Sequence, residues 1–113
     1  MVTLVPTLTR EDRRSLWLHQ AIAAKLGDDP HAALLRARRN LARMSAAHPG
    51  AAPLLREWQR IVRRPLPDIV DVLLDPRPHA RDLRQVTPFA GILSARERAE
   101  VYASFRQYEG RSE

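Results

Sequence analysis

The chain has 113 residues, 44% of them hydrophobic and 28% charged, a balance typical of one folded domain rather than a disordered chain. It contains no cysteine, which excludes disulfide scaffolds, thiolate catalysis and cysteine zinc sites, and no apolar run approaches the roughly 18 residues that cross a bilayer. The net charge is +6, with Lys25 the only lysine beside eighteen arginines. Codon usage would explain the excess of arginine over lysine, but the unbalanced charge favours acidic partners.

The first half of the chain predicts three helices separated by strong breakers. A cap signal at its start and a stop signal at Gly27 predict a helix over 10–26. Asp29 is followed by a proline, and this pair begins a second helix. The HPG motif at 48–50 ends that helix. A third helix begins at Pro53 and is stopped by the next pair of prolines.

The second half predicts two short helices and one longer helix. The short helices span 68–74 and 79–86 between proline pairs, and Leu74 is among the residues expected to face inward. Ser94-x-x-Glu97 is a complete capping box, in which side chains and backbone groups satisfy each other. It begins the last helix, which is expected to end near the glycine at 110.

Together these patterns predict an all-α fold, a compact bundle of five or six short-to-medium helices. We find no alternating pattern typical of a strand, and the aromatic share of 5% leaves a core of Leu, Ile, Val and Ala that suits helices. We expect a single domain over 1–113, with flexible ends at 1–8 and 110–113.

Two of the expected helices carry arginines at helical spacing. The stripes consist of Arg36, Arg39 and Arg43, with Arg38 alongside, and of Arg56, Arg60 and Arg63, with Arg64 alongside. Such stripes can follow a phosphate backbone, or they can be the solvated backs of amphipathic helices. The Asn, Gln, Ser and Thr side chains that usually accompany base-edge contacts are missing from them.

A turn of unusual apolar character, TPFAGIL, precedes the last helix. Phe89 and Leu93 in this turn either fill the protein's own core or form a knob that a partner receives. Gly91 permits a positive φ or a close backbone approach, and Arg84 and Arg98 flank the turn. A preorganised loop of this kind serves a binding site or ties the last helix to the core.

The motifs that carry chemistry are incomplete. A helix-turn-helix match around 19–38 fails, because Asp28 replaces an apolar residue and Pro30 falls where the recognition helix should start. Three carboxylates share one expected helix face, but no phosphate loop or general base accompanies them; they are Asp68, Asp71 and Asp75. The four histidines are scattered, so we expect no catalytic residues, no metal, no cofactor and no enzyme activity.

The segment LRQVTPFAGILSARER at 83–98 resembles the tail of a group of short helical proteins from actinobacteria. Their tails run close to LRQ-x-[ST]PFAG-[VI]-L-[ST]-x-x-ER, and the resemblance extends more weakly to SLWLHQAIAAKL and LLREWQRIV. Members of the group are often regarded as antitoxins or regulators encoded beside a toxin gene. The resemblance implies a small protein that inhibits a partner by direct binding and regulates its own expression.

We therefore expect a cytoplasmic, antitoxin-like protein that neutralises a cognate protein encoded nearby, without a membrane partner. One alternative is a DNA-binding regulator that uses the same arginines, and a second is a homo-oligomeric helical scaffold. A homodimer of the chain is compatible with all of these functions. The residues expected to contact the partner are Arg36, Arg39, Arg43, Arg56, Arg60, Arg63, Arg84, Phe89, Leu93 and Arg98.

Overall fold

The computed structural model describes residues 8–111, which form six α-helices and one 3₁₀ turn and contain no strand. The helices are α1 (Arg10–Asp28), α2 (Pro30–Ala47), α3 (Ala52–Ile61), α4 (Leu66–Leu74), α5 (Pro78–Gln85) and α6 (Ala95–Arg111), and the 3₁₀ turn is Pro49–Ala51. The all-α prediction is confirmed. Of the flexible ends predicted at 1–8 and 110–113, residues 1–7 and 112–113 lie outside the described residues, whereas residues 110 and 111 belong to α6.

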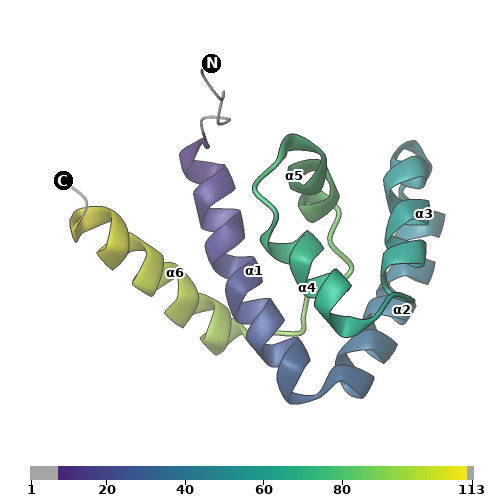
Figure 1. The fold of residues 1–113 in the computed structure, drawn as a ribbon, viewed down its shortest axis with the longest axis horizontal. Helices are drawn as coiled ribbons and strands as arrows, with labels where there is room; N and C mark the ends of the chain where they lie inside the picture. The colour runs from purple at the N-terminus through teal and green to yellow at the C-terminus, as the bar shows by residue number, and fades with distance from the viewer. Residues whose placement is uncertain (1–7, 112–113) are drawn as a thin grey trace.

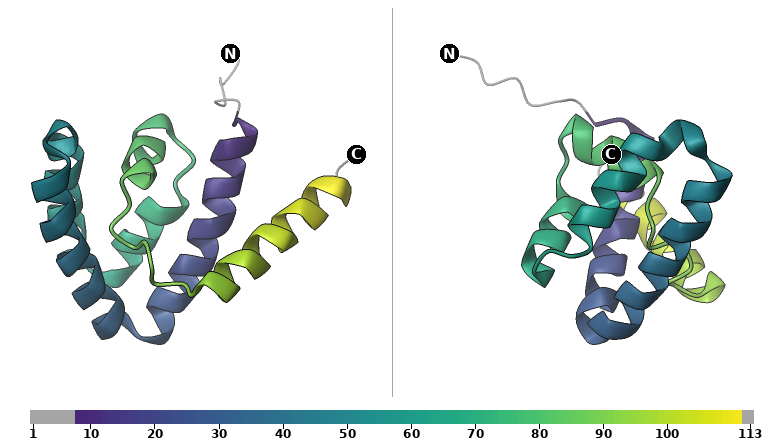
Figure 2. Two further views of the ribbon diagram at one scale, coloured as in Figure 1. Left: turned by 180° about the vertical axis from the view of Figure 1, so that it is seen from behind. Right: turned by 90° about the vertical axis from the view of Figure 1, so that its right-hand side faces the viewer.

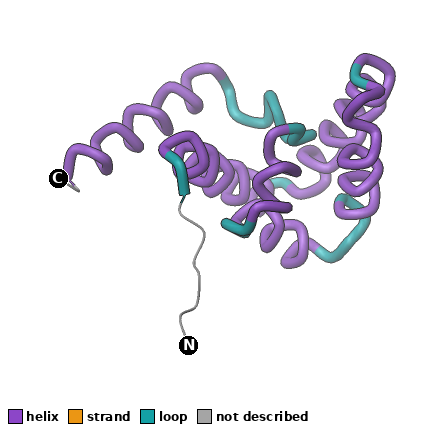
Figure 3. Tube along the Cα trace, turned by 90° about the horizontal axis from the view of Figure 1, so that it is seen from above, coloured by secondary structure: helices purple, strands orange, loops and turns teal. Residues whose placement is uncertain are grey.

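Helix α1 is the centre of the arrangement (Figure 1). It packs against α2, α4 and α6, while α3 packs against α2 and α5. Seen from the front and from behind, α6 leans away on one side of α1, and the α2–α3 hairpin lies on the other side (Figures 1 and 2). The view from above shows the same order, with α4 and α5 between α1 and the hairpin (Figure 3). None of the helices within residues 8–111 is both long and apolar enough to span a membrane.

Side-chain caps begin α1, α2 and α6, whereas α3, α4 and α5 begin with a proline in the first turn and no side-chain cap. The Thr9 hydroxyl accepts a hydrogen bond from the Asp12 backbone N–H at 3.1 Å, and Ser94 caps α6 in the same way at 3.0 Å. The stop predicted at Gly27 is wrong, because α1 continues to Asp28 and only Gly91 has a positive φ among the described residues. Asp29 both ends α1 and caps α2, so the two helices meet at one residue.

Trp58 organises the core beneath the α2–α3 hairpin. It is fully buried, and its indole N–H donates a hydrogen bond to the carbonyl of Leu83 at 2.7 Å, which joins α3 to α5. The ring of Phe89 meets Trp58 edge-on, with 5.9 Å between centroids. Leu73 is buried, whereas Leu74, which we expected to face inward, is 39% exposed, because it is the last residue of α4 and lies about 100° around the helix from Leu73.

Helix α6 is attached mainly through aromatic contacts with α1. Phe105 is its one buried side chain, and the Trp17 ring lies 5.9 Å from it. The Arg14 guanidinium stacks on the Tyr102 ring at 3.7 Å, and Arg10 pairs with a carboxylate near the end of α6 at 3.1 Å. These contacts fix α6 along one side of α1 and leave most of its surface exposed.

A small group of polar side chains is buried between α1 and α5. His19 is 2% exposed, and its Nδ1 donates to the carbonyl of Ser15 at 2.7 Å. Its Nε2 has no hydrogen-bond partner among the described residues. Arg84, which we expected to flank a binding turn, is 3% exposed and donates to the carbonyl of Asp75. The proposed partner contact at Arg84 is therefore wrong: the side chain belongs to the interior.

The buried His19 predicts a stability that falls in mild acid. Burial, aided by the charge of Arg84, lowers the pKa of His19 from 6.5 to about 4. Between these values the unfolded chain binds a proton that the folded chain excludes, so the free energy of unfolding drops as the pH falls. We expect a loss of up to about 3 kcal/mol between pH 6.5 and 4, measured by urea denaturation.

A matched pair of variants isolates this effect. His19→Gln keeps a donor for the Ser15 carbonyl and should flatten the pH dependence, while His31→Gln, at an exposed position, should leave it unchanged. If the free energy of unfolding of His19→Gln falls between pH 6.5 and 4 as steeply as that of the original chain, the pH dependence does not come from His19.

Candidate functional site: a cationic helical hairpin

The positive charge of the chain is concentrated in α2 and α3. Residues 30–64, called the cationic hairpin below, hold eight of the eighteen arginines and a single carboxylate, Glu57. Their formal charge is therefore +7, against +6 for the whole chain, so the remaining residues sum to −1. The hairpin alone accounts for the basic character of the protein.

The arginines of the hairpin have no carboxylate partner among residues 8–111. Outside the hairpin some charges are paired, as in Lys25–Glu97 at 2.9 Å and Arg77–Asp75 at 2.7 Å. Arg98, Arg106 and Arg111 also have no carboxylate partner among residues 8–111. The single acidic group of the hairpin, Glu57, contacts the ring of His79 at 2.6 Å instead of an arginine. The eight arginines of the hairpin carry like charges that repel one another, which costs stability unless a partner neutralises them.

The turn before α6 lies beside two of these arginines. Asn40 is buried in α2, and its amide N–H groups donate to the carbonyls of Pro88 at 2.8 Å and Ala90 at 3.0 Å. Its oxygen accepts a hydrogen bond from the guanidinium of Arg43. One amide side chain thus ties the turn to α2 and orients an exposed arginine at the same time.

Gly91 places the turn against a second arginine. Its φ is +82°, and a Cβ added there would lie 2.9 Å from Nη2 of Arg36. The predicted positive φ and close approach are both confirmed, since only glycine combines this backbone conformation with room for the guanidinium. The apolar turn and the first arginine stripe are therefore parts of one structure.

Helix α3 adds its arginines along the outside of the hairpin. Arg56 and Arg60 of α3, and Arg63 two residues after its end, are all exposed, as the amphipathic pattern predicted. Arg63 and Arg38 line the same shallow hollow between α2 and α3, beside Gln59. At this hollow Arg38, which lies alongside the arginine stripe of α2, comes near Arg63 of the second stripe.

The remaining predicted contact residues do not join this surface. Phe89 is 1% exposed and Leu93 is 6% exposed, so the core alternative is confirmed and their use as contact groups is wrong. They are buried because the turn inserts Phe89 beside Trp58. Arg98 is half-buried on α6, which α1 separates from the hairpin (Figure 1).

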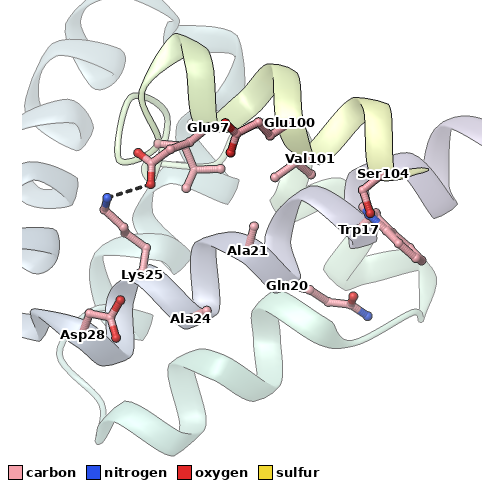
Figure 4. Close-up of a pocket in the computed structure, with 11 residues that line it drawn as sticks. Trp17, Gln20, Ala21, Ala24, Lys25, Asp28, Glu97, Glu100, Val101 and Ser104 are labelled. Atoms are coloured by element: carbon pink, nitrogen blue, oxygen red, sulfur yellow. Dashed lines mark hydrogen bonds and ion pairs between the residues drawn. The ribbon is translucent and has the colours of Figure 1, made fainter. Parts of the chain in front are cut away.

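A second hollow lies between α1 and α6, with Trp17, Lys25, Glu97 and Glu100 among its lining residues (Figure 4). Its central charges are satisfied internally. The backbone N–H of Ser94 and the ammonium of Lys25 hold the pKa of Glu97 at about 2, well below its ordinary value. This groove offers fewer unpaired charges than the hairpin does, so the hairpin is the stronger candidate.

The three carboxylates of α4 and its end do not form a site. Asp75 binds the backbone and guanidinium of Arg77, which lowers the pKa of that carboxyl. Across residues 8–111 no group of three or more His, Asp or Glu side chains is placed to hold a metal ion.

Comparison of the chain with protein-family models, with curated proteins and with solved structures finds no match. The resemblance to antitoxin-like tails therefore stays a prediction. Charge and geometry of the hairpin are the grounds on which a function can be proposed.

Asn40 is the functional residue that the sequence patterns did not single out. It lies three residues after Ala37 and four before Met44, inside the apolar stripe of α2. A lone amide in such a stripe is the signal that could have identified it, because a buried polar group requires partners.

Asn40→Ala should lower the free energy of unfolding by about 1–3 kcal/mol, because two carbonyls of the turn lose their donor. Ser45→Ala, at an exposed position of the same helix, should change it by less than about 0.5 kcal/mol. Urea denaturation followed by circular dichroism measures both. Equal stability of the two variants would show that the amide does not hold the turn.

Proposed function

We propose that this chain is a non-enzymatic, antitoxin-like protein that binds and neutralises a cognate protein through its cationic hairpin. The observation that carries the proposal is the set of eight hairpin arginines without a carboxylate partner in residues 8–111. The antitoxin-like tail supports the same function, because its turn lies against Arg36 and binds Asn40, which accepts a hydrogen bond from Arg43.

Arginine suits a protein partner that is acidic. Its planar guanidinium binds a carboxylate through two parallel hydrogen bonds, and it loses less hydration on burial than an ammonium does. A cluster of such groups also accelerates association with an oppositely charged surface. Neutralisation of the hairpin's own repulsion adds to the affinity.

Co-expression with the product of the adjacent gene should yield a stable complex and rescue cells from that protein's toxicity. The double variant Arg36→Glu/Arg39→Glu should weaken the complex at least about tenfold, measured by titration calorimetry, because it places like charges against the partner. Failure to copurify, together with failure to rescue, would refute the proposal.

The matched control is Arg96→Glu/Arg106→Glu on α6, which lowers the net charge by the same amount at exposed positions outside the hairpin. It should keep the affinity of the original chain. If both double variants weaken binding equally, the effect reflects total charge and not the hairpin.

A second candidate function is binding of nucleic acid, which the same unpaired arginines favour. It predicts that the chain shifts a DNA duplex in a gel at about 50 mM salt and that affinity falls steeply as salt increases. Absence of a shift at micromolar protein would exclude this function.

A further inference from the structure

The outward face of α2 combines its charges with an apolar seam. Four exposed residues at helical spacing form this seam: Ala32, Leu35, Ala42 and Ala46. Leu35 is 40% exposed, one of three large hydrophobic side chains among residues 8–111 that are this accessible. An amphipathic helix that faced only water would carry polar residues in these positions.

Arginines border the seam on both sides. Arg36 and Arg43 lie on the edge next to the turn, where they line a hollow together with Gly91. Arg38 lies on the edge next to α3, where it shares a different hollow with Arg63. Arg39 lies within the seam, in a shallow hollow with Leu35, and its aliphatic stem can cover apolar surface while its charge stays accessible.

We propose that this face of α2 receives an acidic amphipathic helix of the partner protein, an inference that rests on the function proposed above. The alanines allow the two helix axes to approach within about 8 Å, at the close end of the normal range. The apolar stripe of the partner then covers Leu35. Its carboxylates, on both sides of that stripe, pair with the arginines along both edges of α2.

The same features disfavour the other occupants. A phosphate backbone needs cationic and hydrogen-bonding groups but gains nothing from an exposed leucine among alanines. A second copy of the chain, docked through the same face, would oppose arginine to arginine, and like charges in contact cost free energy. An acidic helix matches both the seam and its borders.

The test uses charge-neutral variants, so that the seam is separated from the electrostatics. Leu35→Asn removes the seam's largest side chain, and Leu74→Asn on α4 is the matched control with the same residue type and nearly equal exposure of 39%. The probe is a fluorescent 18-residue peptide, as long as α2, with leucines on one helical face and glutamates on both flanks. A scrambled peptide of the same composition and an 18-base-pair duplex serve as comparison probes.

Fluorescence anisotropy should show at least about tenfold tighter binding of the amphipathic peptide than of the scrambled one. Leu35→Asn should remove that preference, and Leu74→Asn should keep it. Equal affinity for both peptides, tighter binding of the duplex, or no effect of Leu35→Asn would overturn the inference. A dimer of the chain that Leu35→Asn dissociates, detected by light scattering, would overturn it as well.

The cognate complex distinguishes this inference from the function on which it rests. A partner that copurifies and rescues growth, but binds Leu35→Asn as well as the original chain, refutes the acidic helix and leaves the proposed function standing. Leu35-dependent binding of the amphipathic peptide without any effect of the adjacent gene product refutes the proposed function and supports the surface.

Discussion

The contact between Asn40 and the turn before α6 is the constraint on which the rest of the structure depends. It fixes the turn against α2 through two backbone carbonyls, so that Phe89 enters the core beside Trp58. Trp58 in turn holds α5 through the carbonyl of Leu83. Helix α2, helix α3 and the continuous segment formed by α5 and the turn thus meet around one buried amide and one indole. An apolar residue in place of Asn40 would remove the side-chain donor of two backbone carbonyls. The Leu83 carbonyl, in contrast, also accepts a hydrogen bond from the Val86 backbone N–H at 3.1 Å.

Local signals predicted the helices because helix ends are decided by nearby residues. Asp29 and the Ser94–Glu97 pair satisfy backbone groups within three residues of themselves, so their meaning is readable without the fold. The predicted helix stop at Gly27 was wrong because glycine is tolerated inside a helix when no positive φ is needed. The burial of Arg84 was unpredictable for a different reason: its acceptor lies nine residues away, on another element.

The candidate site was predictable in part for the same reason. The arginine stripes follow from helical spacing alone, and their exposure agrees with it. What spacing cannot show is which charges find partners after folding. Six carboxylates of residues 8–111 pair with cations of α1, α5 and α6 or of the loops, and Glu57 of α3 contacts a histidine. The imbalance of the hairpin therefore emerges only when the whole set of ion pairs is known.

In the proposed recognition of an acidic helix, the charge of the hairpin and the apolar seam of α2 would have separate roles. Electrostatic attraction acts over a Debye length of about 8 Å at physiological salt, so the hairpin can attract an acidic surface without selecting among such surfaces. Selection requires contacts that fail when the shape is wrong, and the exposed Leu35 among alanines supplies such a contact. The hydrogen bond from Arg43 to Asn40 limits the freedom of that side chain before binding, so less of it remains to be lost in the complex. The turn thus contributes from inside the fold, because it is the backbone that Asn40 binds.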